Sequence, residues 1–365
     1  MRVVHCGKFY PPDLRGGLES VVAGLNAELV RRGVAVSAVV AARRGAGSVS
    51  TVDGVRVVRA ATFGTLLSQP VAPALPGLLH AEVGDLVHLH NPNPLGCWAA
   101  AHDTGRPLVV THHSDIVRQR ALWPIVGPVV TAALRRARYI AIGSEQLLRA
   151  SRELTGFTAK ARVIPFGIDA ARFAPAPAVT ARARELRAGW GARPVVLAVG
   201  RLVGYKGFDV LLTAARGLEA TVVLVGTGPE AARLARLAGP NVVFAGHVDD
   251  ADLAAYYHAC DVFCLPSLTM AEAFGMVLLE AMACGKPLLT TILPTGVAAV
   301  NRDGQTGLAV RPGDVGALRE ALVALLDDEP RRLAMGRAAR EVQAREYTAE
   351  LMGERYLSLY RDALA

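Results

Sequence analysis

Two cations lie close together in the stretch VGRLVGYKGFD, residues 199–209, directly after a strand-like run. Arg201 can bind a phosphate through two parallel hydrogen bonds, and Lys206 offers a mobile point charge. Ligands of open parallel sheets bind at the carboxyl ends of strands, so this position suits a phosphate group. The alternative is a pair of surface cations in a turn. The spacing is not G-x-x-x-x-G-K-[ST], which excludes a Walker loop.

Two carboxylates enclose an apolar run in the stretch EAFGMVLLEAMACG, residues 272–285. The pattern predicts a helix from about Phe274, with Gly275 leaving room for a phosphate beside the unpaired first amides. At the helical rise per residue, Glu272 and Glu280 are about 12 Å apart, roughly the reach of a diphosphate with a sugar on each side. Both could accept hydrogen bonds from sugar hydroxyls. The alternative for either acid alone is a dipole partner or a solvated helix face. The amides expected at the phosphate are those of Phe274, Gly275, Met276 and Val277.

A glycine-rich loop, GKFYPPDLRGGLES at residues 7–20, follows the first predicted strand and opens a helix. Gly16 and Gly17 permit close backbone approach, and a helix N-terminus offers free N–H groups to an anion. The loop lacks the G-x-G-x-x-G pattern, which argues against a dinucleotide site. A plain turn between strand and helix is the alternative, as it is for the glycine turn VGTGPE at residues 225–230.

Histidines gather in two places, HLH at residues 88–90 and THH at residues 111–113. His88 and His90 share one face of a strand, and His112 and His113 end the next strand. No carboxylate spacing supports a metal site, so we expect none, and interpret these residues as hydrogen-bonding partners of a substrate or as core histidines. In DDADLAAYYHAC, Asp250 and Asp252 form a D-x-D, which we expect to cap a helix rather than bind a metal.

Val-rich strands alternate with helical patterns twice along the 365 residues, which predicts parallel sheets. We expect an α/β fold with two Rossmann-like domains facing each other across a cleft. The predicted first domain covers residues 1–167, and residues 168–193, rich in Ala, Pro and Arg, form a linker. Residues 194–345 form the second domain, and a helix at 346–365 packs back on the first domain. The predicted strands are 2–6, 34–41, 55–59, 86–90, 107–111, 138–142, 161–164, 193–200, 220–226, 241–246, 261–266 and 286–291; a helix is predicted at 18–33 and three more over 314–364.

The composition indicates a globular protein with reduced cysteines. Five scattered cysteines include no C-x-x-C pair, and Met1 leads into a strand-like run rather than a secretory signal. No run of 18 apolar residues is present, so we expect a cytoplasmic protein without a membrane span. The net charge of +8 suits a polyanionic partner, namely nucleic acid, anionic lipid or a phosphorylated substrate. No basic aromatic platform is present, so nucleic acid is not expected.

Taken in order, these motifs resemble family 4 of the glycosyltransferases, retaining enzymes of GT-B fold. The resemblance covers essentially the whole chain. It rests on GKFYPPDLRGGLE, THHSDIVRQ (111–119), VIPFGID (163–169), VGRLVGYKGFDVLL (199–212), VGTGPE, the Glu-x7-Glu segment with LEAMACGKPLL, and DGQTGLAVRPGD (303–314). The tract TILPTGVAAVN (291–301) resembles a subgroup from polysaccharide and O-antigen gene clusters that often transfers mannose from GDP-mannose.

The resemblance implies a role for each candidate residue. Arg201 and Lys206 would neutralise the donor diphosphate, helped by the amides near 274–277. Glu280 would hold the ribose hydroxyls, and Glu272 the hydroxyls of the donor sugar. The base would contact the backbone near 244–248.

In the first domain, Gly16 and Gly17 would lie against the same diphosphate. His113 best matches the family's histidine near the anomeric centre, with His112 as the alternative one position away.

The implied reaction moves a hexosyl group from a nucleoside-diphosphate sugar to a hydroxyl of a glycan or polyprenyl-diphosphate-linked acceptor, with retention and without a metal or other cofactor. A nucleotide-sugar 2-epimerase or phosphorylase of the same architecture is the alternative. The segment 116–138, with Arg clusters around Trp123, is a candidate for contact with the cytoplasmic face of an anionic membrane; an ordinary amphipathic helix is the alternative.

Overall fold

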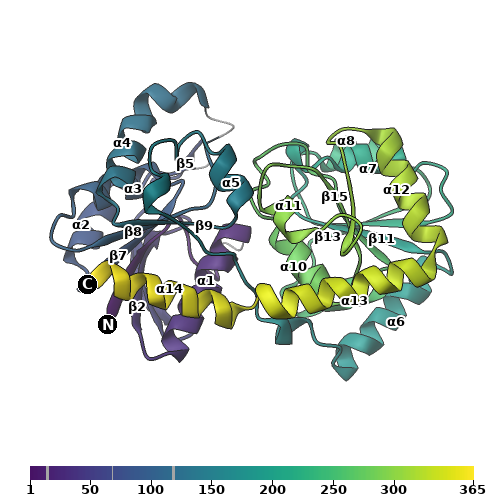
Figure 1. The fold of residues 1–365 in the computed structure, drawn as a ribbon, viewed down its shortest axis with the longest axis horizontal. Coiled ribbons are helices and arrows are strands. Elements are labelled where there is room, and N and C mark those ends of the chain that lie inside the picture. The colour runs from purple at the N-terminus through teal and green to yellow at the C-terminus, as the bar shows by residue number, and fades with distance from the viewer. Residues whose placement is uncertain (14–15, 68, 117–119) are drawn as a thin grey trace. The chain divides into compact units, whose positions relative to one another are not determined.

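The computed structural model describes residues 1–13, 16–67, 69–116 and 120–365. The chain divides into two compact units, one of residues 1–167 and 349–365 and the other of residues 168–348. Each unit is an open sheet with helices on both faces (Figure 1). Three predicted segments, 7–20, 111–119 and 116–138, each include residues outside the described part of the chain.

The sheet of the first unit has the strand order β10-β9-β8-β7-β1-β2-β4-β3, and it is parallel except for the pairing of β3 with β4. Helices α1 and α14 pack together on one face, and α2, α3 and α4 pack in sequence on the other (Figure 1). Such coverage explains why the inner strands are apolar on both faces. The strands are β1 (Arg2–Cys6), β2 (Ala35–Ala41), β3 (Ser48–Val52), β4 (Val55–Ala60), β7 (Leu86–Asn91), β8 (Leu108–His112), β9 (Tyr139–Ile142) and β10 (Ala161–Val163), with a separate hairpin of β5 (Thr65–Leu66) and β6 (Gln69–Pro70). The helices are α1 (Gly17–Arg31), α2 (Leu75–Ala81), α3 (Pro94–His102), α4 (Trp123–Arg136), α5 (Glu145–Ala150) and α14 (Ala349–Leu364).

The sheet of the second unit has the order β13-β12-β11-β14-β15-β16 and is parallel throughout its described pairs. Helices α7, α8 and α12 lie on one face, and α6 packs against α9 on the other. The strands are β11 (Val195–Val199), β12 (Thr221–Val225), β13 (Val242–Gly246), β14 (Val262–Leu265), β15 (Leu288–Thr291) and β16 (Gly307–Val310). The helices are α6 (Pro177–Trp190), α7 (Phe208–Ala214), α8 (Ala231–Leu237), α9 (Asp250–Ala259), α10 (Met276–Ala283), α11 (Gly296–Val300), α12 (Val315–Asp327) and α13 (Glu329–Glu346).

The strand order creates a switch point in each sheet. From β11 the chain proceeds to β12 and β13 on one side, whereas β14, the other neighbour of β11, leads to β15 and β16 on the opposite side. In the first unit, β1 and β7 are neighbours with the same divergence. Because crossovers on the two sides run over opposite faces, the loops after these strands separate and leave room for a ligand. The loops after β1, β7, β11 and β14 therefore hold the candidate sites.

All twelve predicted strands are present, as are the helix at 18–33 and the three helices over 314–364. Four short strands were not predicted. β3 is largely exposed at the edge of its sheet, and β5 and β6 have two residues each, so these three have no apolar run to indicate them. β16 (Gly307–Val310) lay inside a segment interpreted only as a motif.

The linker prediction for residues 168–193 is wrong, because these residues belong to the second unit. Helix α6 packs Val179, Ala183, Leu186 and Trp190 onto Ala255 and Ala259 of α9. That spacing is one helical stripe, and it is sparse enough to be hidden by the Ala- and Arg-rich composition. The chain passes back to the first unit at residue 349, and α14 then packs on α1.

No helix in the described part of the chain is long and apolar enough to cross a membrane. All five cysteines are unpaired and buried, in agreement with the expectation of reduced thiols.

Candidate functional site

The switch point of the second sheet brings together the two chemical motifs of that unit. Arg201 and Lys206 follow β11, and Glu272 lies on the loop after β14, the neighbouring strand. The sequence separates the cations from the acid by more than sixty residues, and the strand order places them side by side.

Lys206 and Glu272 form a buried ion pair. The Lys206 ammonium lies 2.5 Å from Glu272 Oε2, and the Ser267 hydroxyl donates to the same oxygen at 2.9 Å. Burial alone would lower the pKa of Lys206, but the charges of Glu272 and, beyond it, Glu280 raise that pKa above its ordinary value. The lysine is therefore a fixed cation, and Glu272 Oε1, which bonds to no described residue, remains as an acceptor.

Gly200 explains how the lysine reaches this place. Its φ is +152°, and a Cβ built on it would lie 3.3 Å from Lys206 Cε. A larger residue would strain the backbone and crowd the lysine stem, so glycine at the end of β11 is part of the site.

Arg201 contrasts with Lys206. Its side chain is exposed and makes no hydrogen bond or ion pair with any residue in the described ranges. The motif thus contains one cation fixed by a carboxylate and one cation available to an anionic ligand.

Helix α10 begins later than the sequence predicts. The helix runs from Met276, with Gly275 as its N-cap at a φ of +79°, a left-handed conformation that favours glycine. Phe274 lies outside the helix, with its side chain buried and its ring 6.2 Å from that of Tyr347. The predicted amide set of 274–277 is therefore reduced, within the helix, to Met276 and Val277. The separation of about 12 Å predicted between Glu272 and Glu280 assumed a continuous helix. It does not apply, because residues 272–275 are not helical.

Glu280 projects from the second turn of α10. Tyr257 of α9 donates its hydroxyl to Glu280 Oε2 at 2.6 Å. Burial raises the pKa of Glu280 to about 7, and the hydrogen bond from Tyr257 offsets only part of that rise. The carboxyl group consequently titrates in the physiological range, which neither its type nor its sequence position indicates.

In the first unit, Gly16 is the N-cap of α1, and Gly17 is the first helical residue. A Cβ at Gly16 would meet Glu19 Oε2 at 2.6 Å, so glycine is needed for the buried Glu19 to fold back on the helix start. Burial raises the pKa of Glu19 and lowers that of Lys8, and the two charges act on each other. Gly16 therefore lies beside a buried acid, Glu19, whose charge interacts with that of the half-buried Lys8, and the sequence did not single out either residue.

Sheet register assigns the histidines to opposite faces. His5 is in register with His88, and His90 with Thr111. Because side chains alternate along a strand, His88 and His90 share a face with Thr111 and with His113, the residue that follows β8. Asn91 and His112 point to the other face.

That assignment favours His113 over His112 as a ligand contact. His112 Nδ1 lies 3.0 Å from the amide nitrogen of Asn91, and its Nε2 lies 2.9 Å from Asp115 Oδ1, so both ring nitrogens are occupied. His113 Nε2 lies 3.1 Å from His90 Nδ1, whereas its Nδ1 bonds to no described residue. Phe166 stacks on the His113 ring with centroids 5.2 Å apart and fixes its plane.

Two side-chain groups in the first unit have metal-ligand types, namely His5, His88 and His90, and His112, Asp115 and Glu153. In the first group every ring nitrogen except His5 Nε2 already makes a hydrogen bond. A metal ion would have to displace those bonds. The histidines are better explained as a buried hydrogen-bonded cluster.

The D-x-D of residues 250–252 is structural, but its capping role differs from the prediction. The N-cap of α9 is Asp249, and Asp250 and Asp252 lie in the first turn, where a negative charge suits the helix dipole. Asp250 also pairs with Arg172 at 3.1 Å.

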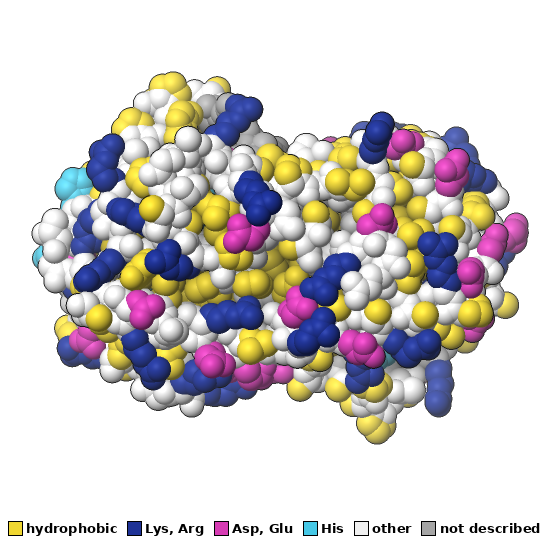
Figure 2. Space-filling view, viewed as in Figure 1, with side chains coloured by type: hydrophobic (Ala, Val, Ile, Leu, Met, Phe, Trp, Pro, Cys, Tyr) yellow, Lys and Arg dark blue, Asp and Glu magenta, His cyan; other side chains and the backbone are white. Residues whose placement is uncertain are grey.

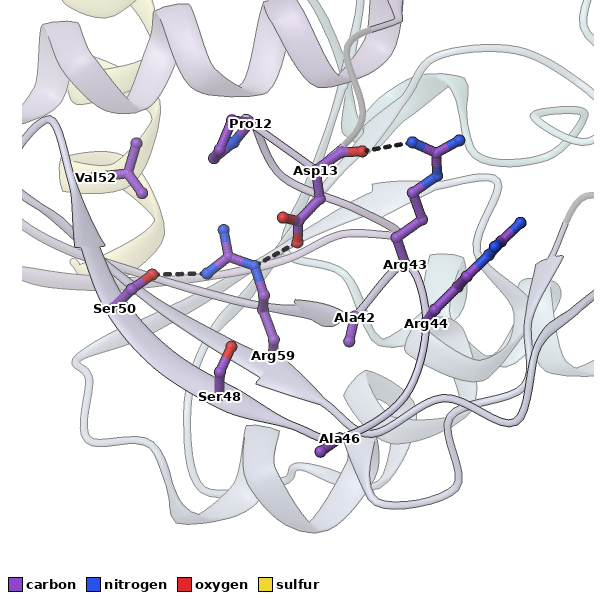
Figure 3. Close-up of a pocket in the computed structure, with 10 residues that line it drawn as sticks. All are labelled: Pro12, Asp13, Ala42, Arg43, Arg44, Ala46, Ser48, Ser50, Val52 and Arg59. Carbon is purple, nitrogen blue, oxygen red and sulfur yellow. Dashed lines mark hydrogen bonds and ion pairs between the residues drawn. The ribbon is translucent and has the colours of Figure 1, made fainter.

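A basic pocket of about 780 Å³ opens in the first unit beside the end of the glycine-rich loop (Figure 3). Its buried Arg59 donates to Asp13 at 2.6 Å and to Ser50 at 2.7 Å, so the charge of that residue is balanced. Arg43 and Arg44 are exposed on its rim. Positive charge at the rim over a neutralised interior suits an anionic group. On the face of the molecule shown in Figure 2, basic side chains are scattered among acidic ones.

Sequence reasoning missed Ser267 and Tyr257, the hydrogen-bond partners of the two glutamates. Ser267 follows β14, so the rule about strand ends could have indicated it. Tyr257 is one of two adjacent tyrosines in α9, and nothing in their spacing shows which one faces α10.

Similarity to solved structures defines the fold. The fold matches sucrose-phosphate synthase from Thermosynechococcus elongatus with a TM-score of 0.82 over 99% of this chain and 98% of that one, at 24% identity. It also matches Anabaena HepE, solved with UDP and glucose, with a TM-score of 0.79 over 98% and 99% of the two chains, at 21% identity. The fold is therefore GT-B, as predicted.

Family models and relatives carry the assignment further. Residues 15–172 match the model of Glycosyltransferase Family 4, and residues 185–342 match that of Glycosyl transferases group 1. The chain is 32% identical to O-antigen chain mannosyltransferase C of Escherichia coli, over 100% of this chain and 99% of the relative. It is 36% identical to D-rhamnosyltransferase WbpZ of Pseudomonas aeruginosa over 74% and 71% of the two chains. A GDP-mannose-dependent phosphatidylinositol monomannoside mannosyltransferase of Mycolicibacterium smegmatis is 32% identical over 90% of each.

This chain belongs to glycosyltransferase family 4, and it is a glycosyltransferase. These relatives are transferases, so the 2-epimerase alternative is not supported.

Proposed function

We propose that the protein transfers a hexosyl group, mannose from GDP-mannose, to a hydroxyl of a glycan or lipid-linked acceptor in cell-surface polysaccharide assembly. The activities for which the relatives are named support the sugar class. The observation that carries the proposal is the buried pair of Lys206 and Glu272 at the β11/β14 switch point, with the exposed Arg201 on the same loop as Lys206. Two cations beside a helix N-terminus suit a diphosphate, and carboxylate oxygens next to them suit hydroxyls.

Each side chain has one role in donor binding. Arg201 and Lys206 contact the diphosphate, and the Met276 and Val277 amides of α10 add donors to it. Glu272, held by Lys206 and Ser267, accepts from the sugar hydroxyls through its open oxygen. Glu280, held by Tyr257, accepts from the ribose hydroxyls. Within the first unit, we propose Gly16 and Gly17 at the start of α1 and His113 as ligand contacts.

The chemical step breaks the bond between the anomeric carbon and the phosphate oxygen and forms one to the acceptor oxygen on the same face. The departing phosphate oxygen takes the acceptor proton. Charge develops on the diphosphate, where fixed cations and amide dipoles stabilise it without reorganising. A metal ion is not needed for this role, and Glu272 serves in binding because its carboxylate is already engaged by Lys206 and Ser267.

A panel of nucleotide sugars tests the donor assignment. Saturation-transfer NMR is expected to show transfer to the sugar, ribose and base protons of GDP-mannose above those of UDP- and ADP-sugars. Turnover with a polyprenyl-diphosphate glycan should then yield a product one hexose longer. Release of free hexose without acceptor extension would contradict the proposed reaction.

The buried Glu280 gives donor binding a pH dependence. Its pKa near 7 means that the carboxylate needed for the ribose forms as pH rises from 6 to 8, so the donor KM should fall over that range. In Glu280→Gln the KM should be about tenfold higher at pH 8, the cost of one hydrogen bond to a charged group, and nearly independent of pH. Steady-state kinetics with saturating acceptor measure both.

As pH rises, the stability of the protein should decrease while donor binding improves. A carboxyl whose folded pKa is raised contributes stability below its unfolded pKa of about 4.5, and this contribution is lost as pH rises through about 7. Glu280→Gln should therefore raise Tm by a few degrees at pH 8 and leave it unchanged at pH 4.5. Glu320→Gln, an exposed change on α12, is the matched control.

A pH-independent KM in the unmodified protein would contradict the assignment of Glu280 to the ribose hydroxyls.

We also propose peripheral contact with anionic membrane through the region of α4, whose Ile125 is 74% exposed. Its other side is packed, with Val130, Ala133 and Leu134 buried. Co-sedimentation with vesicles containing anionic lipid tests this, and equal recovery with neutral vesicles would contradict it.

A further inference from the structure

Three histidines form a continuous chain through the first unit. His113 Nε2 lies 3.1 Å from His90 Nδ1, and His90 Nε2 lies 2.9 Å from His5 Nδ1. The three rings are 6%, 1% and 1% exposed. Burial lowers the pKa of each ring, to about 3 for His5 and well below the ordinary value for the other two. Each imidazole is therefore neutral, with one N–H and one lone pair.

The hydrogen bonds of this chain can run in only two directions, which we call its two polarities. Each of the two short contacts needs one proton, so fixing one ring's tautomer fixes the other two. In the first polarity His5 donates to His90, His90 donates to His113, and His113 carries its proton on Nδ1. In the second all three tautomers are reversed, and His113 presents a lone pair at Nδ1.

The closed end of the chain decides between them. His5 Nε2 is buried and has no hydrogen-bond partner. The second polarity would put a proton there and leave a buried N–H unpaired, which native proteins rarely tolerate. The first polarity leaves only the lone pair of His5 Nε2 without a hydrogen-bond donor. His88, the nearest other ring, cannot accept, because Thr111 and Tyr360 occupy its nitrogens at 2.6 Å each.

We propose that this chain fixes His113 as the Nδ1–H tautomer, so that His113 acts on its ligand as a hydrogen-bond donor and not as a base. The inference deepens the proposed function, on which the identity of the ligand oxygen rests. That oxygen belongs to a hydroxyl of the donor sugar or to the leaving phosphate. His90 and His5 are positioning residues, one and two strands away from the binding contact along the sheet order β8-β7-β1.

Long-range ¹H–¹⁵N correlation on protein labelled with ¹⁵N-histidine tests the tautomer directly. The His113 signals are identified by their loss in His113→Asn. The expected spectrum shows His113 protonated on Nδ1, and His90 and His5 likewise. A spectrum with His113 protonated on Nε2, or exchanging between tautomers, would overturn the proposal. The tautomers are measured on the unmodified protein, and His113→Asn serves only to assign the His113 signals.

Variants then separate positioning from packing. His90→Phe removes the bond that fixes His113, so its tautomers should exchange, and kcat/KM should fall severalfold. Thr111→Ser, on the same face but outside the chain, keeps the hydroxyl that occupies His88 Nε2 and should leave the His113 tautomer unchanged, and a shift there would argue against the chain as the cause. Addition of the nucleotide sugar distinguishes the two proposals. If the Nδ1–H signal of His113 is present but does not shift when the donor is added, the proposed tautomer stands. The proposed contact between His113 and the donor is then contradicted.

Discussion

Replacing Arg201 by Ala is expected to lower kcat/KM by about 10²- to 10³-fold, the usual effect of removing one hydrogen-bond donor that faces developing negative charge. Tm should not change, because the side chain is exposed and bonds to no residue in the described part of the chain. Steady-state kinetics and thermal unfolding on the same preparation measure both quantities.

Two further variants sharpen this test. Arg337→Ala removes another exposed arginine of the second unit and should leave kcat/KM unchanged. Arg201→Lys keeps the charge but not the two parallel bonds, so its activity should lie between those of the native protein and the alanine variant. Full activity in Arg201→Ala would mean that the diphosphate lies elsewhere.

Removing the buried cation should affect both activity and stability. Lys206→Met eliminates a diphosphate contact and leaves Glu272 as a buried charge with Ser267 as its remaining partner. Breaking one half of a buried ion pair costs about 3–5 kcal/mol, whereas replacing both halves is close to neutral. We expect a loss of activity of at least the size predicted for Arg201→Ala, together with a lower free energy of unfolding.

The double variant Lys206→Met/Glu272→Gln separates the two effects. It should recover most of the lost stability in denaturant unfolding, because no unpaired charge remains, and it should recover no activity. Recovered activity would show that Lys206 matters only as the partner of Glu272. A single variant as stable as the native protein would show that the pair does not form.

The sequence indicates those candidate residues whose own type and position suggest a role, and it does not indicate their partners. Arg201, Lys206, Glu272 and Glu280 can be proposed as site residues from the sequence, because each lies near a strand end or a helix start, where cations and acids suit a polar ligand. Their partners were not found, because Lys206 and Glu272 pair only after β11 and β14 become neighbours. The same limit applies to Tyr257 and to the histidine chain, whose members lie on three strands.

The fold was predictable where apolar runs are long. The buried Val-rich strands and the amphipathic helices were found with small shifts at their ends, whereas the exposed strand β3 and the sparse stripe of α6 were missed. The helix start at Met276 was placed two residues early, because Gly275 was interpreted as helical rather than as a left-handed cap. In each case the local pattern was too weak to compete with tertiary packing.

We propose that Arg201, Lys206 and the amides of α10 stabilise the leaving diphosphate, with no metal and with retention. Proton NMR of the product formed from GDP-mannose and acceptor in excess EDTA tests this most directly. We expect the α-linked product at the rate found without EDTA. A β-linked product, or turnover that stops in EDTA and returns with a divalent metal, would contradict it.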